Sequence, residues 1–153
     1  MKRHSLLIIA LIISILFGTY TFITQQIQRK KSNEIFINCI YKATGPFAID
    51  YSKVSEEDKI SYYMEASAYL HTAISILPFT SYANVENKTG ASNALSKLYL
   101  SISLYATPQS NNRTIAFTEK EKAINKYLYF ISINPNDKEN WDSLSRIAVD
   151  IGY

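Results

Sequence analysis

The sequence predicts an all-α protein in which a single N-terminal transmembrane helix precedes a small helical domain. The chain of 153 residues contains one long and largely apolar stretch without a charged residue, from Ser5 to Ile23. Farther along, apolar residues recur at intervals of three and four, which is the period of a helix with one buried face. No segment alternates apolar and polar residues convincingly enough to predict a strand.

The stretch from Ser5 to Ile23 is long enough to cross a membrane. Its nineteen residues would rise about 28 Å as a helix, close to the thickness of the hydrocarbon layer. A buried helix of a soluble core is rarely this long and apolar beside a cationic N-terminus. A cleaved signal peptide is the stronger rival, but its apolar core usually has about 7–15 residues. We therefore expect residues 5–23 to be an uncleaved membrane anchor.

The positive charge of the chain belongs to the flanks of this anchor. The net charge is +3, but residues 1–31 carry five bases and no acid, which leaves eleven bases and thirteen acids in the remainder. Nucleic-acid binding needs a concentrated basic face on the folded part, so we expect no nucleic-acid partner. The single cysteine, Cys39, excludes an internal disulfide framework and a cysteine-based zinc site.

The orientation of the anchor is balanced between two arguments. Lys2 and Arg3 precede the span, whereas Arg29, Lys30 and Lys31 follow it. The count of Lys and Arg favours a cytoplasmic C-terminal domain. A short basic N-terminus directly before the apolar run is instead typical of a signal-anchor that exports its C-terminal domain. We favour a single-pass membrane protein with the C-terminal domain on the non-cytoplasmic side.

We divide the chain into an anchor with basic flanks, residues 1–31, and a helical domain, residues 32–153. A linker from Gln25 to Lys31 is expected to join them. The periodicity and the breaking residues predict five domain helices, over residues 33–42, 55–77, 89–105, 118–134 and 137–151.

Capping residues support several of these boundaries. Ser32 is placed to cap the first domain helix and Ser55 the second, whose first turn is acidic. Thr118 and Glu121 have the spacing of a capping box and predict the start of the fourth helix. The positions expected to face inward are Ile35, Phe36, Cys39, Ile40, Ile60, Tyr63, Met64, Ser67, Leu70, Ile74, Leu77, Ala91, Ala94, Leu95, Leu98, Ile102, Tyr105, Ala123, Ile124, Tyr127, Leu128, Ile131, Trp141, Leu144, Ile147, Ala148 and Ile151.

Two parts of the domain carry spacings that resemble the tetratricopeptide repeat. The second-helix pattern is matched by Ala66, Leu70, Ala73, Ile74 and Pro78, and again by Ala123, Tyr127 and Pro135; the first-helix pattern is matched by Leu95 with Tyr99, and by Trp141 with Leu144 and Gly152. The resemblance covers residues 60–153. It departs from the family in that Ser96 and Ser145 replace glycine, Phe130 and Ala148 replace alanine and tyrosine, and Pro78 and Pro135 are 57 residues apart. It implies either stacked helical hairpins or, where the pattern fails, an ordinary small helical bundle.

The tetratricopeptide family presents its first helices along a concave groove that binds ligands. The resemblance therefore implies four partner-binding candidates, Asn93, Lys97, Asp142 and Arg146. The alternative for each is a solvated position on a helix face.

The sequence lacks a recognisable catalytic constellation. His4 and His71 are not spaced to hold a metal together, and His71 is expected to be a packed or edge histidine. Cys39 has no sequence neighbour that would activate a thiolate, so we expect it to act as a buried small hydrophobe. We interpret the chain as a non-enzyme without a cofactor or a bound metal.

The leading hypothesis is a membrane-anchored helical-repeat scaffold that binds a partner protein at the membrane. The alternative is a small accessory subunit of a larger membrane complex, because Ala10, Ser14 and Gly18 are spaced four apart and form one small-residue face on the span. A carrier of lipid or small ligands between the helices is a third, weaker hypothesis.

Overall fold

The computed structural model describes residues 2–50, 53–85, 90–105 and 111–151. Within these ranges the protein is helical and has no strand, which confirms the predicted fold class. The elements are α1 (Lys2–Thr44), η1 (Gly45–Ala48), α2 (Glu56–Ile76), η3 (Leu77–Phe79), η4 (Ser81–Val85), α4 (Ala91–Tyr105), α5 (Asn111–Ile133) and α6 (Lys138–Asp150), where η marks a short 3-10 helix.

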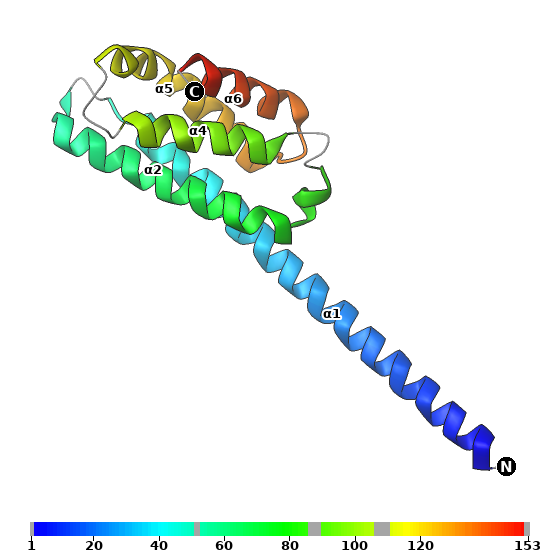
Figure 1. The fold of residues 1–153 in the computed structure, drawn as a ribbon. Helices are drawn as coiled ribbons and strands as arrows, with labels where there is room; N and C mark the ends of the chain where they lie inside the picture. The colour runs from blue at the N-terminus through cyan, green and yellow to red at the C-terminus, as the bar shows by residue number, and fades with distance from the viewer. Residues whose placement is uncertain (1, 51–52, 86–89, 106–110, 152–153) are drawn as a thin grey trace.

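Helix α1 runs without a break from the apolar stretch into the domain. Its first half projects from the bundle as an isolated rod, and its second half packs among the other helices (Figure 1). The predicted linker from Gln25 to Lys31 is wrong, and Ser32 lies inside the helix instead of capping a new one. Gln, Arg and Lys are good helix formers, and no Gly or Pro occurs between Thr19 and Thr44, so nothing interrupts the hydrogen bonds of the backbone. The predicted stop at Gly45-Pro46 is confirmed.

The projecting half of α1 is apolar and exposed to solvent in the structure. Large apolar side chains from Leu7 to Ile27 are each at least half exposed. The helix is long and apolar enough to cross a membrane. This agrees with the predicted span over residues 5–23, although the side chains of residues 5 and 6 lie outside the described set.

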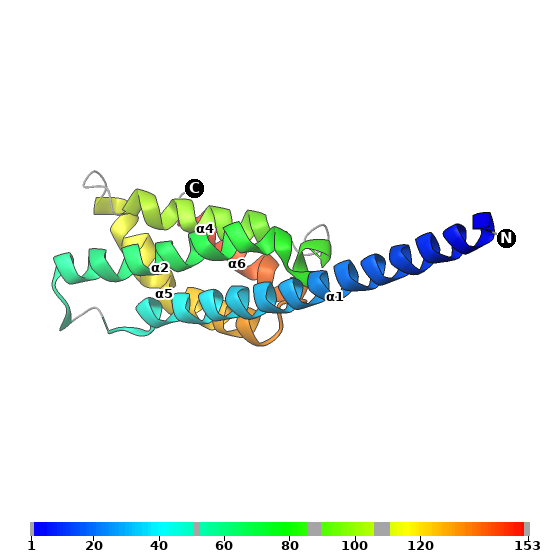
Figure 2. The same ribbon diagram turned by 90° about the horizontal axis from the view of Figure 1, so that it is seen from below.

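The remaining helices close into a ring with the second half of α1. Helix α1 packs against α2 and α5, α2 packs against α4, α4 packs against α6, and α6 packs against α5. Both views show the second half of α1 lying alongside α2 as one member of the bundle (Figures 1 and 2). The ring gives no evidence of tetratricopeptide-like repeats, so that resemblance stays a prediction.

Small residues determine which face of α2 enters the core. Ala66 and Ala73 are fully buried together with Tyr63, Leu70 and Leu77. Ile60 and Met64, which the periodicity placed inward, are exposed, and Ser67 and Ile74 are only partly buried. The buried face of α2 is therefore rotated toward its alanines, which have no long side chain to hold the neighbouring helices apart.

Helix α5 begins earlier than its predicted capping box. It starts at Asn111, so Thr118 and Glu121 lie within the helix and not at its N-terminus. The local Thr-x-x-Glu pattern is overruled because no breaking residue separates Asn111 from Thr118. The predicted start of the preceding helix, at Thr89, lies outside the described residues.

Helix α6 closely matches its prediction. The Asp137 carboxylate accepts a hydrogen bond from the Glu139 N–H at 3.0 Å and so caps the helix. The predicted inward residues of this helix are all buried: Trp141, Leu144, Ile147, Ala148 and Ile151. The Trp141 indole donates to the Pro135 carbonyl oxygen at 2.8 Å and fixes the turn between α5 and α6.

Candidate functional site

Two of the four predicted partner-binding residues, Asp142 and Arg146, lie on the exposed face of α6. They occupy successive turns of the helix, opposite the side on which Leu144 and Ala148 enter the core. The structure therefore places both charged side chains where a partner can reach them.

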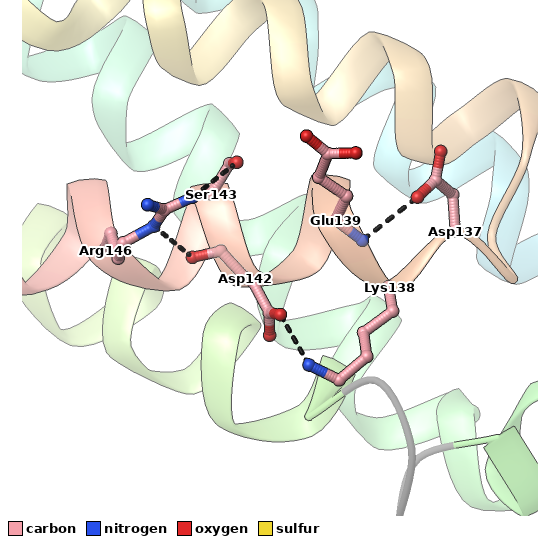
Figure 3. Close-up of polar contacts among 6 residues, drawn as sticks. All are labelled: Asp137, Lys138, Glu139, Asp142, Ser143 and Arg146. Carbon is pink, nitrogen blue, oxygen red and sulfur yellow. Dashed lines mark hydrogen bonds and ion pairs between the residues drawn. The ribbon is translucent and has the colours of Figure 1, made fainter.

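Local contacts hold these two side chains in place along the helix. Lys138 forms an ion pair with the Asp142 carboxylate one turn away (Figure 3). The Arg146 guanidinium donates to the Asp142 carbonyl oxygen at 3.4 Å and to the Ser143 hydroxyl at 3.2 Å (Figure 3). Ser143 is buried, but Lys138, Asp142 and Arg146 are exposed, so their contacts contribute little stability and leave the charges open to exchange with a partner.

The other two predicted residues, Asn93 and Lys97, lie one turn apart on α4. Asn93 is exposed and Lys97 is half-buried. Helix α4 packs directly against α6, and the Ser101 hydroxyl lies 3.1 Å from the Ala148 carbonyl oxygen across that contact. The structure thus puts the two predicted pairs on adjacent helices, but among the described residues no hydrogen bond or ion pair joins one pair to the other.

A groove between α2 and α4 forms a recess on the domain surface, and the sequence did not predict it. Its volume is about 640 Å³, and its lining consists of Met64, Ser67, Ala68, His71, Thr72, Tyr99, Ile102 and Ser103. The His71 and Tyr99 rings meet across it, with centroids 5.5 Å apart and planes at 47°. The signal that the sequence offered was Met64, but it was assigned to the core.

The chemistry of this groove suits apolar recognition. Met64 is 61% exposed, and its flexible thioether adapts to different apolar surfaces. Among the described residues, the lining carries hydroxyl groups and the His71 imidazole but no carboxylate, lysine or arginine. The Thr72 hydroxyl already donates to the Ala68 carbonyl oxygen at 2.9 Å. The arrangement can hold an apolar segment with a polar margin.

A buried acidic group lies on the inner side of the bundle. Glu121 of α5 is 7% exposed, and Lys59 of α2 is 5% exposed. Burial raises the pKa of Glu121 to about 7, and the positive charge of Lys59 partly opposes that rise. Within the described residues, no hydrogen-bond donor reaches Glu121 Oε1. This carboxyl group makes the stability of the domain sensitive to pH.

The two remaining candidate groups are Cys39 and His71. Cys39 is buried as predicted, and burial raises the pKa of its thiol while Lys42 lowers it to a lesser extent. His71 lies at the edge of α2, as predicted, where it contacts Tyr99. The described residues contain no group of three or more His, Cys, Asp or Glu side chains suited to a metal ion.

The features that bear on function are therefore the exposed apolar half of α1, the groove between α2 and α4, and the polar faces of α4 and α6. None of them is explained by a known relative. The chain matches no protein-family model, no curated protein and no solved structure.

Proposed function

We propose that the chain is a single-pass membrane scaffold whose helical domain binds a partner protein beside the bilayer. The observation that carries this proposal is the apolar half of α1, which no other element covers and which continues into the domain without a linker. An apolar surface of this length is unfavourable in water and favourable in lipid. The anchor would hold the domain close to partners in the same membrane and raise its effective concentration for them.

The polar groups within the apolar stretch are compatible with a bilayer. The hydroxyls of Thr19, Thr21 and Thr24 donate to the carbonyl oxygens of Ile15, Gly18 and Tyr20 at 2.8, 2.9 and 2.9 Å. These bonds satisfy hydroxyl groups that would otherwise be unpaired in hydrocarbon.

The groove between α2 and α4 supports the binding part of the proposal. Exposed Met64 and the His71–Tyr99 ring contact give it an apolar centre, and Ser67, Thr72 and Ser103 give it polar edges. Protein interfaces combine the same two features. Because α4 packs against both α2 and α6, the four polar candidates Asn93, Lys97, Asp142 and Arg146 stand on the other side of α4 from the groove.

The anchor is tested by alkaline extraction of membranes that contain the full chain. We expect the protein to stay in the membrane pellet at high pH, and to become extractable when Ile12 and Leu16 are both replaced by Lys. Charged residues at the centre of a span oppose insertion by about 2.5 to 3.5 kcal/mol each. Full extraction of the unaltered chain would contradict the anchor.

The binding surface is tested by photocrosslinking in intact membranes. A photoreactive amino acid is placed at Met64 in the groove, at Asn93 beside α6, and at Lys122 as an exposed control on α5. We expect one protein to be crosslinked from Met64 or Asn93 and not from Lys122. Equal labelling from all three positions, or none from any, would remove the support for a specific partner.

The accessory-subunit alternative rests on the small-residue face of the span. Gly18 has open space where a side chain would stand, and Ala10 and Ser14 precede it at four-residue intervals. Such a face lets another transmembrane helix approach closely. Replacing Gly18 by Leu would release a permanent subunit from its complex, whereas a scaffold that binds through its domain would keep its partner.

A further inference from the structure

The turn after α2 lies directly beside the basic segment that follows the apolar stretch. A recess of about 490 Å³ separates them, and its lining consists of Gln25, Gln28, Arg29, Lys31, Ser32, Pro78 and Phe79. Both views show η3 and η4 at the end of the bundle from which α1 extends toward the N-terminus (Figures 1 and 2). Phe79, an aromatic residue distant in the sequence, thus lies beside Arg29 and Lys31 in the part of the domain nearest the span.

Hydrogen bonds fix this turn against α1. The Asn33 side chain donates from Nδ2 to the Ser81 hydroxyl at 2.9 Å and accepts from the Ser81 N–H at Oδ1 at 2.8 Å. The Thr80 hydroxyl donates to the Leu77 carbonyl oxygen at 2.7 Å and accepts from the Tyr82 N–H at 3.1 Å. Phe79 is therefore presented by a rigid turn, and yet its side chain is 66% exposed.

Because α1 is continuous, helix geometry gives the distance of its basic residues from the hydrocarbon layer. If the span ends near Thr24, Arg29 lies about 7.5 Å farther along the helix axis. The headgroup layer extends roughly 5 to 7 Å beyond the hydrocarbon on each side. Arg29, Lys31 and the turn that carries Phe79 then stand at the outer limit of the headgroups. A small tilt of the rod toward this side brings them into contact with the lipid.

The positive charge of this surface favours anionic lipid headgroups. Arg29, Lys30 and Lys31 follow one another, and no acidic residue precedes Glu34 in the chain. Basic residues next to a span are attracted to anionic headgroups, and apolar aromatic side chains bury favourably at the boundary between headgroups and acyl chains.

We propose that the domain docks on anionic lipid headgroups of its own membrane, through Arg29 and Lys31 of α1 and Phe79 of the adjacent turn. The inference rests on the proposed membrane anchor and adds a second attachment, which holds the domain at a defined tilt. None of these three residues lines the groove between α2 and α4, so the docked domain keeps that groove open to a partner.

The test uses the full chain, one molecule per lipid nanodisc, with no other protein present except the scaffold of the disc. A nitroxide is attached at Phe79→Cys in a Cys39→Ser background, and its accessibility to a water-soluble relaxation agent is compared in neutral discs and in discs with 30% phosphatidylglycerol. Labels at Ile15→Cys and Lys122→Cys serve as references for the hydrocarbon and for water. We expect the label at position 79 to be shielded from water in anionic discs and exposed in neutral discs.

The charge contribution is tested with the double variant R29Q/K31Q. Each base near an anionic surface favours the bound state about fivefold. The two substitutions together should therefore lower the ratio of docked to undocked domain by about 25-fold. The matched control is K122Q/K126Q, which removes the same charge at the far end of α1, where Asn125 binds the Thr44 carbonyl oxygen. We expect the control to leave the shielding unchanged.

Three results would overturn the docking proposal. In the first, the label at position 79 in anionic discs is as exposed to water as the label at position 122. In the second, the label at position 79 is shielded equally in neutral and anionic discs. In the third, R29Q/K31Q and K122Q/K126Q change that shielding equally. In each case a label at position 15 that remains in the hydrocarbon shows that the anchor itself holds. A label at position 15 that is exposed to water would instead contradict the anchor, and with it the docking that depends on it.

Discussion

Asn33 and Ser81 are joined by two hydrogen bonds although 48 residues separate them in the chain. The amide of Asn33 uses both its donor and its acceptor, and one of its partners is the backbone N–H at the start of η4. The pair connects the middle of the long helix α1 to the turn that follows α2. It therefore couples the folding of the domain to the rod that carries the membrane span.

We predict that Asn33→Ala lowers the free energy of unfolding by about 1 to 3 kcal/mol, because it leaves the part-buried Ser81 N–H without its partner. Ser81→Ala should cost less, since the Asn33 acceptor still receives the backbone bond. Asn38→Ala, at an exposed position of the same helix, should stay within about 0.5 kcal/mol of the parent. Urea unfolding in detergent micelles, followed by the fluorescence of the single Trp141, measures all three. Equal effects at positions 33 and 38 would show that the pair contributes nothing.

A second long-range hydrogen bond joins the C-terminal end of α1 to α5. The Asn125 side chain donates to the Thr44 carbonyl oxygen at 2.9 Å, which satisfies one of the last carbonyl groups of α1. We predict that Asn125→Ala lowers the unfolding free energy by about 1 kcal/mol in the same urea experiment. Lys122→Ala, at an exposed position of the same helix, is the control and should be nearly neutral. A neutral Asn125→Ala would mean that water replaces the bond without loss.

The absence of a linker predicts resistance to proteolysis. Trypsin requires an extended substrate, so Arg29, Lys30 and Lys31 should be cut slowly while α1 is helical. Insertion of Gly-Gly between Gln28 and Arg29 should accelerate cleavage there roughly tenfold, because the helix then opens locally. The same insertion after Asp50 should not change cleavage at Arg29. Cleavage of the parent chain as fast as the Gln28 insertion variant would contradict a continuous helix.

The elements that the sequence predicted well are those governed by local signals. Helix α6 has a capping aspartate, Asp137, and apolar residues at the helical spacing, and both act as expected. The end of α1 at Gly45-Pro46 is similarly local. The linker prediction failed because Arg29 to Lys31 are good helix formers and no Gly or Pro lies between Thr19 and Thr44.

The candidate surfaces depend on tertiary packing, which no local pattern specifies. The groove lies along α2 where that helix buries Ala66 and Ala73 and leaves Met64 exposed. The turn that carries Phe79 lies beside Arg29, and the hydrogen bonds between Asn33 and Ser81 hold that turn against α1. The positions of Asp142 and Arg146 on the exposed face of α6 followed from periodicity, whereas their proposed role in binding is not tested by the fold.

Glu121 illustrates the same limit and gives a prediction about pH. Its spacing from Thr118 indicated a surface capping box, but the side chain is buried within α5 near Lys59 of α2. Burial raises the pKa of Glu121 from 4.5 to about 7. Between these two values the unfolded chain releases the proton while the folded protein keeps it, so the folded state binds more protons and its stability falls as the pH rises.

We predict that Glu121 contributes stability that is fully present below about pH 4.5 and lost as the pH rises through about 7. The amount is on the order of 3 kcal/mol, from about 1.4 kcal/mol for each unit of difference in pKa. Other carboxyl groups add their own pH dependence, so the measurement is the difference in unfolding free energy between the parent and Glu121→Gln from pH 5 to pH 8. That difference should move in favour of the glutamine variant as the pH rises.

Two further variants make this prediction specific. Glu119→Gln, at an exposed position of the same helix, should follow the parent at every pH. Lys59→Met removes the charge that opposes the rise, so it should raise the pKa of Glu121 further and move the loss of stability to higher pH. Parallel pH profiles for the parent and Glu121→Gln would show that the carboxyl group titrates alike in the folded and unfolded chains, and hence that it is not buried in solution.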